Sequence, residues 1–281
     1  MVIVVASGKG GTGKTTVATN LALSLASHQR VQFLDLDVEE PNAHIFLKPQ
    51  DLHQEKVNKK VPRVDYDKCT FCGLCADVCA FNALVVLHGE VLFFSELCHS
   101  CGACSYFCPA DAIREDDREI GVIESAELDN ISFHQGKLHI GEVAAPAIIS
   151  ALKQRLKRDG TVIMDAPPGT SCSVIESVKG VDFCVLVTEP TPFGLSDLKL
   201  MVELLKQLQI PAGIIVNRYQ EGRTEVEDYA RVEGIQVMAR IPFDRKIATC
   251  YSEGRPFIKV LPGYAGTFAG LLPRIEGLVG A

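Results

Sequence analysis

The sequence predicts an α/β protein in which a doubly wound, mostly parallel sheet carries a second, small α+β domain inserted into the chain. Short runs of β-branched and other apolar residues alternate with helical segments, which is typical of parallel strands covered by helices. Polar and acidic residues directly follow several of these strands, where open α/β sheets bind their ligands. A segment with eight closely spaced cysteines interrupts the alternation and predicts the inserted domain.

The length and composition limit the classes of function. A chain of 281 residues has room for one large and one small domain. Its formal charge of −7 argues against a protein that binds nucleic acid non-specifically, because no overall positive field attracts phosphates. No apolar run reaches the roughly 18 residues that cross a membrane, and the first run is too short for a signal peptide. We therefore expect a cytoplasmic protein without a nucleic-acid or membrane partner, whose eleven cysteines favour metal binding over disulfides.

The glycine-rich loop is the strongest functional signal in the chain. It follows the apolar run 2–6 and precedes an Ala- and Leu-rich helical segment, and it contains the complete G-x-x-x-x-G-K-T pattern. Its glycines let backbone N–H groups face phosphates, and the helix N-terminus adds a partial positive charge. Lys14 would reach the terminal phosphates and Thr15 would bind Mg²⁺. The pattern predicts a P-loop NTPase domain that binds ATP through Gly8, Gly10, Gly11, Thr12, Gly13, Lys14, Thr15 and Thr16.

Two later strands end in aspartate. The run 31–34 leads into Asp35-Leu36-Asp37, and the run 161–164 leads into Asp165, which Pro-Pro-Gly follows. Asp165 holds the position of a Walker-B carboxylate beside Mg²⁺, and the loop after it could respond to the γ-phosphate. The alternatives are a helix N-cap or solvated turn carboxylate for Asp37 and a plain strand-to-helix turn for Asp165.

Eight of the cysteines form two runs of equal spacing, C-x-x-C-x-x-C-x-x-x-C. This is the pattern of bacterial two-cluster ferredoxins, in which the fourth cysteine of each run binds the cluster of the other run. We therefore predict a bacterial-type ferredoxin domain at residues 60–116. A pair of zinc ribbons would leave the third and fourth cysteines of each run without a task. One [4Fe–4S] cluster is assigned to Cys69, Cys72, Cys75 and Cys108, and the other to Cys98, Cys101, Cys104 and Cys79.

The remaining segments complete the predicted organisation. The polar stretch 51–61 predicts a linker to the inserted domain, and residues 83–94 predict a hairpin within that domain. The acidic residues 115–117 indicate where the chain returns to the nucleotide-binding domain. The nucleotide-binding domain then comprises residues 1–59 and 117–281. We expect short strands with turns at 129–130 and 135–136, helices at 144–158 and 195–208, a strand at 212–216 and a C-terminal helix, 264–279, broken by Pro273.

Lys9, directly after the first glycine of the loop, makes the chain resemble the deviant-Walker ATPases of the MinD/Mrp superfamily. These include the MinD and ParA positioning ATPases, the Mrp-type iron–sulfur carriers and the nitrogenase iron protein. The resemblance covers essentially the whole chain and implies an ATP-dependent homodimer in which Lys9 reaches the partner's nucleotide, as an arginine finger does. The alternative is a solvent-facing loop lysine. The resemblance also implies that Asp37 activates the attacking water near Mg²⁺, that Asn217 reads the adenine edge, and that the loop with Pro242 and Phe243 covers the base.

Cys172 follows the Asp165 loop at the separation at which the nitrogenase iron protein has a cysteine that bridges two subunits through one cluster. The second bridging cysteine of that protein has no counterpart here, and two thiolates per dimer do not hold a cubane by themselves. We therefore favour a buried or inert Cys172 over a bridging ligand. Cys184 lies in an apolar run and is expected in the core, and Cys250 carries no spacing signal.

Together these features favour an ATP-binding and ATP-hydrolysing iron–sulfur protein, an ATP-gated electron-transfer homodimer that acts on a redox partner protein. Its catalytic candidates are Lys9, Lys14, Asp37 and Asp165. Thr15, Asp37 and Asp165 are the candidate Mg²⁺ ligands. The alternative is a carrier or assembly ATPase of the Mrp type, whose partner would be a cluster acceptor. A positioning switch like ParA or MinD is a third hypothesis, but it has no use for eight ligand cysteines.

Overall fold

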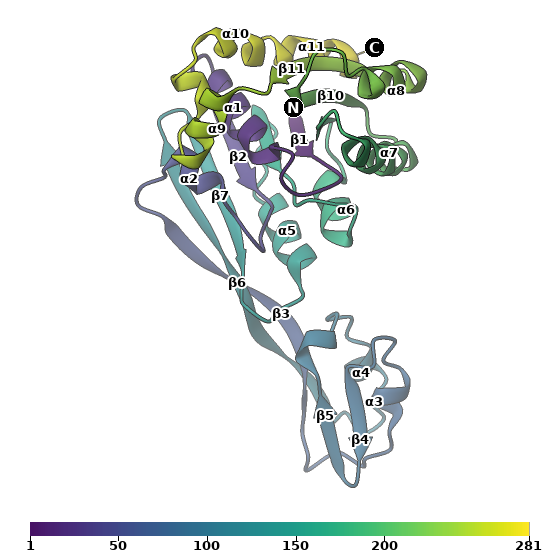
Figure 1. The fold of residues 1–281 in the computed structure, drawn as a ribbon. Coiled ribbons are helices and arrows are strands. Elements are labelled where there is room, and N and C mark those ends of the chain that lie inside the picture. The colour runs from purple at the N-terminus through teal and green to yellow at the C-terminus, as the bar shows by residue number, and fades with distance from the viewer. Residues whose placement is uncertain (281) are drawn as a thin grey trace.

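The computed structural model describes residues 1–280, and these contain one large sheet of nine strands (Figure 1). The strands are β1 (Val2–Ala6), β2 (Val31–Asp35), β3 (His53–Val64), β6 (Ile113–Leu128), β7 (Ile131–Leu138), β8 (Thr161–Asp165), β9 (Phe183–Thr188), β10 (Ala212–Tyr219) and β11 (Gln236–Pro242). Their order is β11-β10-β9-β1-β8-β2-β7-β6-β3. Every pair from β11 to β7 is parallel, and only β7–β6 and β6–β3 are antiparallel. The prediction of a mostly parallel α/β sheet is confirmed.

Helices cover both faces of the sheet. They are α1 (Lys14–Ala26), α2 (Ala43–Leu47), α5 (Ala145–Lys153), α6 (Cys172–Val178), α7 (Pro192–Gln207), α8 (Glu225–Glu233), α9 (Arg245–Ser252), η2 (Phe257–Lys259), α10 (Gly263–Ala269) and α11 (Leu271–Val279). No helix among residues 1–280 is long and apolar enough to cross a membrane.

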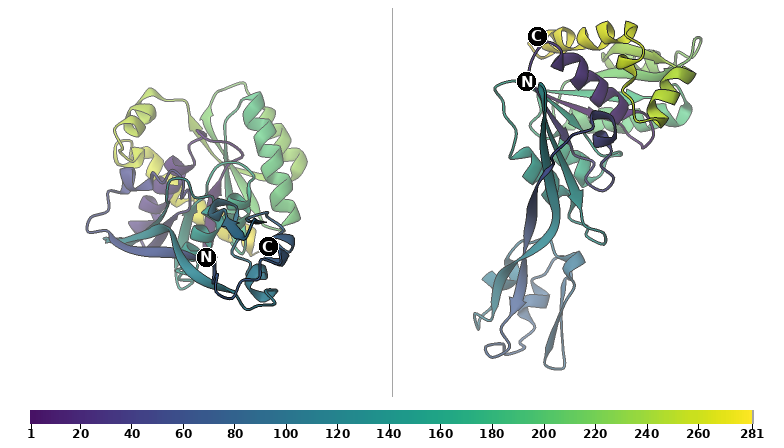
Figure 2. Two further views of the ribbon diagram at one scale, coloured as in Figure 1. Left: turned by 90° about the horizontal axis from the view of Figure 1, so that it is seen from below. Right: turned by 90° about the vertical axis from the view of Figure 1, so that its left-hand side faces the viewer.

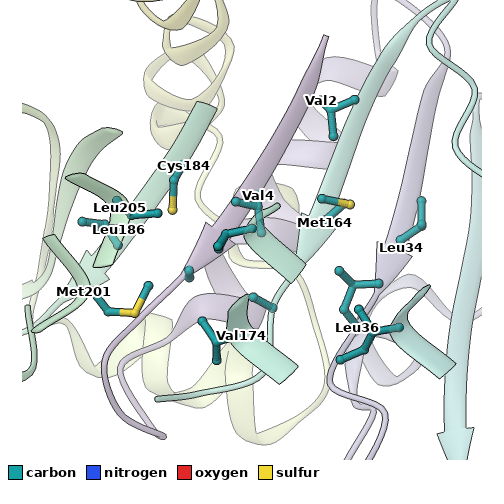
Figure 3. Packing of buried hydrophobic residues seen from close by; sticks show 14 of the residues in the cluster. Val2, Val4, Leu34, Leu36, Met164, Val174, Cys184, Leu186, Met201 and Leu205 are labelled. Atoms are coloured by element: carbon teal, nitrogen blue, oxygen red, sulfur yellow. The ribbon is translucent and has the colours of Figure 1, made fainter. Parts of the chain in front are cut away.

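The core consists of two hydrophobic clusters, one on each face of the sheet. One cluster joins alternate residues of the central strands, such as Val4 and Met164, to α5, α6, α7 and α8 (Figure 3). The other joins the intervening residues, such as Ile3 and Ile163, to α1, α10 and α11. Strands β1, β2, β8 and β9 are buried along their whole length. This burial explains why these strands read as continuous apolar runs rather than alternating ones.

Strands β3 and β6 continue beyond the sheet as an antiparallel ribbon that carries a separate lobe, residues 65–112 (Figures 1 and 2). The lobe contains α3 (Leu74–Asp77), η1 (Ser95–Leu97), α4 (Ala103–Tyr106) and the antiparallel hairpin of β4 (Leu84–Leu87) and β5 (Glu90–Phe93). The predicted hairpin at 83–94 is therefore present. Because β7 ends opposite Gly121 of β6, the lobe lies beyond the carboxyl ends of the parallel strands.

The prediction of a linker at residues 51–61 is wrong, because residues 53–61 belong to β3, which pairs with β6 from His53 to Val64. Both faces of the ribbon are largely exposed, so its residues are polar and lack the alternation that marks a half-buried strand. The acidic residues 115–117 likewise lie within β6. The lobe is inserted at the tip of this ribbon, between β3 and β6. The predicted boundaries at 59/60 and 116/117 fall inside the two paired strands.

Three further local expectations need correction. Residues 135–136 form no turn but lie inside β7, where Gly136 is required because a Cβ would approach a methyl carbon of Ile148 to 2.7 Å. Helix α5 ends at Lys153, five residues before the predicted end at 158. The C-terminal helix is broken at Gly270 and not at Pro273. Pro273 lies in the first turn of α11, where a backbone N–H has no partner within the helix, so its absence in proline costs no hydrogen bond. The expected turn at 129–130 is present between β6 and β7.

Candidate functional site

A cavity of about 480 Å³ lies at the carboxyl ends of the parallel strands, and the glycine-rich loop forms one wall of it. This volume is in the range of small-molecule sites. Ten of the predicted site residues line the cavity, namely Gly10, Gly11, Gly13, Lys14, Thr15, Thr16, Asp37, Asn217, Pro242 and Phe243. Pro168, in the predicted γ-phosphate-responsive loop after Asp165, also lines the cavity. The structure adds residues that the sequence had not assigned to the site, including Asn42, Arg218 and Tyr251. Gly8, Lys9, Thr12 and Asp165 lie next to the cavity lining and are not part of it.

The loop between β1 and α1 has the backbone that a phosphate-binding loop needs. Gly11 and Gly13 have φ angles of 78° and 93°, in the left-handed region that favours glycine. Helix α1 begins at Lys14, so its free N–H groups face the cavity that Lys14 and Thr15 line. Gly8 serves a different purpose: a Cβ there would lie 2.3 Å from the carbonyl oxygen of Asp197, so glycine permits α7 to pack against the loop.

Asn217 connects β10 to this loop. Its Nδ2 donates to the carbonyl oxygen of Thr12 at 2.7 Å, and its Oδ1 accepts from the backbone N–H of Arg218 at 2.9 Å. Both polar atoms of the Asn217 amide thus have partners within the chain. The contact of Asn217 with adenine remains a prediction. Tyr251 of α9 packs against Phe46 of α2 with ring centroids 5.3 Å apart and ring planes tilted by 37°, and Tyr251 and Phe243 both line the cavity.

Three aspartates gather at the ends of β2 and β8. Asp35 and Asp165 are opposite each other in the parallel pairing of these strands, and both are fully buried. Burial raises the pKa of Asp165 to about 7, and the charge of Lys14 offsets only part of this effect. Burial likewise raises the pKa of Asp37 to about 6. The pKa of Asp35 is raised by burial and by the neighbouring Asp165.

The carboxylate of Asp165 is suited to a metal ion. Both of its oxygens are buried and neither has a hydrogen-bond partner among residues 1–280. A buried carboxylate without a partner is costly, and a divalent cation would compensate it. Mg²⁺ is usually held by one or two carboxylates together with substrate phosphates. Asp165, Asp37 and the Thr15 hydroxyl therefore fit the predicted Mg²⁺ site, beside Lys14, which is only 7% exposed.

Asp35 has a structural role that the sequence did not reveal. Its carboxylate accepts hydrogen bonds from the backbone N–H groups of Asp37, Asn42 and Ala43 at 3.1, 3.0 and 2.9 Å. These three bonds hold the turn that carries Asp37 against the end of β2. Asp35 therefore positions Asp37 in the cavity. The only available signal was the D-x-D spacing itself.

The Lys9 side chain is partly exposed to solvent and also lies next to a carboxylate of its own chain. Its Nζ lies 3.8 Å from Oε1 of Glu189, and Oε2 of Glu189 accepts a hydrogen bond from Arg218 at 3.1 Å. The Glu189 side chain is 12% exposed, whereas that of Lys9 is 33% exposed. In the single chain Lys9 is therefore held next to its own loop by Glu189, which sequence reasoning had not assigned to the site.

The lobe brings its eight run cysteines together in two groups. One cavity is lined by Cys69, Cys72, Cys75 and Cys108, and a second by Cys79, Cys98, Cys101 and Cys104. Each group mixes three cysteines of one run with the fourth of the other, which is the predicted assignment. No three His, Cys, Asp or Glu side chains among residues 1–280 lie close enough to hold a single metal ion. A cubane needs no such group, because each thiolate binds a different iron of the cluster.

The three remaining cysteines lie outside the lobe. Cys184 and Cys250 are buried, as expected for Cys184. Cys172 is exposed at the first position of α6, so the buried form of the expected buried or inert Cys172 is wrong, and whether the thiol is inert or a bridging ligand stays a prediction. Its helix packs on the sheet through Val174 and Val178, which turns the first residue toward solvent.

Comparison with known proteins identifies relatives of the whole chain. The model of the CobQ/CobB/MinD/ParA nucleotide binding domain matches residues 3–257. An uncharacterized protein of Methanocaldococcus jannaschii is 32% identical over 262 residues, 92% of each chain. The iron–sulfur cluster carrier protein of Aquifex aeolicus is 24% identical over 276 residues, 92% of this chain and 61% of that protein.

Solved structures resemble the fold. The septum site-determining protein MinD of Pyrococcus horikoshii, in complex with Mg-ADP, has a TM-score of 0.58 at 23% identity and covers 99% of this chain and 97% of its own. The cell division ATPase MinD of Pyrococcus furiosus has a TM-score of 0.59 at 23% identity, covering 99% and 98%. At these identities the likeness shows the fold alone.

Proposed function

Because the chain belongs to the CobQ/CobB/MinD/ParA nucleotide-binding family, we propose that it hydrolyses ATP and uses this reaction to gate electron transfer through two [4Fe–4S] clusters. The observation that carries the proposal is the division of eight cysteines into two cavities with four cysteines each, in a lobe beyond the carboxyl edge of the sheet. The P-loop and Asp37 lie at that same edge. The clusters supply one-electron transfer when bound.

The nucleotide site has the groups that ATP hydrolysis requires. The N–H groups of the loop and Lys14 would bind the phosphates, and Thr15 and Asp165 would hold Mg²⁺. Asp37 lines the cavity, and Asp35 fixes the turn that carries it, so Asp37 is placed to orient a water molecule and accept its proton. Its raised pKa, about 6, makes it a better base than an ordinary aspartate at neutral pH.

The proposed dimer is formed by two chains that face each other across their nucleotides. Lys9 leaves Glu189 and donates to the phosphates bound by the partner, which stabilises the charge that develops on the transferred phosphoryl group. Hydrolysis removes this anionic contact and lets the subunits separate. A redox partner protein would then bind to one of these two arrangements more tightly than to the other.

A carrier of iron–sulfur clusters is the second candidate. Relatives at low identity are named iron–sulfur cluster carrier proteins, and Cys172 is exposed beside the loop that follows Asp165. In that case a cluster is cargo that leaves the protein for an acceptor. The eight lobe cysteines would still hold resident clusters, because each cluster would be bound by four thiolates.

The test is an EPR-monitored redox titration of the anaerobically reconstituted protein, with MgADP, MgATP or no nucleotide. We expect about eight irons per chain and a cluster potential or reduction rate that MgATP changes in the wild type but not in Lys14→Ala. If MgATP leaves the cluster potentials and reduction rates unchanged but stimulates transfer of iron to an apo-ferredoxin acceptor, the carrier replaces the electron-transfer proposal.

A further inference from the structure

Lys59 is an unusual residue for an exposed ribbon, because it is buried. Its side chain is 4% exposed, although the neighbouring residues 58 and 60 of β3 are exposed. Its Nζ donates to the carbonyl oxygen of Ser95 in the lobe at 2.9 Å and lies 3.3 Å from Oε2 of Glu142. A buried ammonium group needs such partners, because an unpaired one loses its hydration without compensation. Lys59 therefore connects the lobe to the body of the protein.

Glu142 connects both strands of the ribbon at this point. It lies in the loop between β7 and α5, and its side chain is 7% exposed. Its Oε1 accepts from Nη2 and Nε of Arg118 at 2.7 and 3.1 Å, and Arg118 of β6 pairs with Lys59 of β3 in the register of the ribbon. Burial opposes ionisation of Glu142, but the bond from Arg118 and the charge of Lys59 outweigh it and hold its pKa below the ordinary value.

The loop of Glu142 is also attached to the nucleotide site. Val38, the residue after Asp37, accepts a hydrogen bond through its carbonyl oxygen from the N–H of Leu138 at 2.8 Å. The carbonyl oxygen of the next residue, His139, accepts a hydrogen bond from the backbone N–H of Glu142 at 3.1 Å. A shift of the turn that carries Asp37 therefore acts directly on the end of β7 and on the loop that bears Glu142.

On the lobe side, the contact of Lys59 is made to the segment of a predicted cluster ligand. The carbonyl oxygen of Ser95 accepts from both Lys59 Nζ at 2.9 Å and the N–H of Cys98 at 3.2 Å. The cavity that Cys98 lines is also lined by Lys60 and Pro62 of β3. This cavity therefore adjoins the ribbon next to Lys59, and the other four-cysteine cavity adjoins Val64 at the end of the strand.

We propose that Lys59, Glu142 and Arg118 form a latch that transmits the position of the Asp37 turn to the Ser95–Cys98 segment of the lobe. The inference rests on the proposed function for its purpose, because the latch would let bound nucleotide alter the surroundings of one cluster. The physical basis is a continuous series of direct contacts: Val38 to Leu138, His139 to Glu142, Glu142 to Lys59, and Lys59 to Ser95. Glu142 is a positioning residue in this scheme and touches neither nucleotide nor cluster.

The experiment is hydrogen–deuterium exchange of the reconstituted protein, followed in peptides that cover residues 94–100 and 136–142. It compares wild type, Glu142→Gln, Lys59→Met and Lys59→Arg, each without nucleotide and with a non-hydrolysable ATP analogue and Mg²⁺. Without nucleotide, we expect exchange of the 94–100 amides to rise about tenfold in Glu142→Gln and Lys59→Met and to stay near wild type in Lys59→Arg. The analogue should change exchange at 136–142 in all variants. Its effect on 94–100 should be lost when the latch is broken.

Asp117→Asn is the matched control, since Asp117 pairs with Lys60 on the exposed side of the same ribbon. It should behave as wild type. The latch is refuted if Glu142→Gln, with normal iron content, retains wild-type exchange at 94–100, or if the analogue leaves these amides unchanged in wild type. A different outcome would contradict the proposed function: MgATP would leave the rate of electron transfer unchanged, while the ATP analogue still changed the exchange of residues 94–100.

Discussion

Nδ2 of Asn217 donates a 2.7 Å hydrogen bond to the carbonyl oxygen of Thr12, so the end of β10 holds the phosphate-binding loop in place. The fit is close, because a Cβ on Gly13 would lie 2.4 Å from the same Nδ2. The loop thus depends on a side chain far away in the sequence for its shape.

Asn217→Ala should weaken ATP binding about five- to tenfold, because losing this partly buried hydrogen bond costs about 1 kcal/mol and loosens the loop. Titration calorimetry with MgATP measures this. Asn130→Ala is the control, since Asn130 makes a comparable side-chain bond to the carbonyl oxygen of Ala26 away from the site. Equal affinities for the Asn217 variant and the wild type would show that the loop keeps its shape without this bond.

Glu189→Gln should strengthen ATP-dependent dimerisation about two- to fivefold, because Lys9 no longer has to leave an ion pair in its own chain. Lys9→Ala should retain ATP binding and lose dimerisation and hydrolysis. Sedimentation velocity with MgATP gives the dimer fraction. Glu227→Gln breaks a comparable pair with Arg240 far from Lys9 and should have no effect. A weaker dimer in Glu189→Gln would mean that Glu189 itself takes part in the interface.

The raised pKa values of Asp165 and Asp37 predict how pH affects the metal-free protein. Between about pH 4 and pH 7 the folded state holds protons that the unfolded chain has released, so the free energy of unfolding should decrease as pH rises through this window. Above about pH 7 this contribution should no longer change. Thermal denaturation in EDTA from pH 5 to pH 8 measures the effect, and Asp165→Asn should reduce the slope.

The affinity of the protein for Mg²⁺ should have the opposite pH dependence and increase as pH rises. Mg²⁺ needs ionised carboxylates, so its affinity in the presence of ADP should fall about tenfold per unit as pH drops below about 7 and more steeply below about 6, with release of protons on binding. Asp117→Asn, which removes an exposed carboxylate, is the control. An affinity that is constant from pH 5 to pH 8 would exclude Asp165 and Asp37 as ligands.

The two four-cysteine cavities predict which pairs of cysteine variants damage one cluster and which damage two. Cys79→Ser combined with Cys101→Ser alters one cavity and should leave about four irons per chain. Cys79→Ser combined with Cys72→Ser alters both cavities and should leave fewer. Iron analysis and EPR after anaerobic reconstitution distinguish them. The reverse result would mean that each run binds its own cluster.

Cys172→Ala should keep about eight irons per chain, with or without MgATP, if Cys172 is no cluster ligand. The exposed thiol should react with a maleimide in the free protein. About ten irons in the wild type, reduced to eight in this variant, would indicate one additional cluster per dimer. That outcome would favour the carrier over the electron-transfer protein.

Features that depend on local spacing could be read from the sequence. The strand–loop–helix at residues 2–26 and the hairpin at 83–94 are present as predicted, because neighbouring residues alone determine them. The mostly parallel sheet followed from its uninterrupted apolar runs. The ribbon of β3 and β6 was missed because its exposed strands have no hydrophobic alternation. The role of Asp35 was missed because it depends on backbone groups of a turn whose shape the sequence does not show.

Three parts of this protein could be recognised from its residues, because their chemistry is set by close neighbours along the chain: a phosphate-binding loop, carboxylates at strand ends and two cysteine runs. The folded structure determines how these parts are connected. It placed Asn217 on Thr12 and Lys9 on Glu189, and it buried Lys59 between Glu142 and Ser95. The physical reason is that such contacts join residues far apart in sequence, and their energy depends on burial and distance that arise only when the sheet and ribbon are assembled.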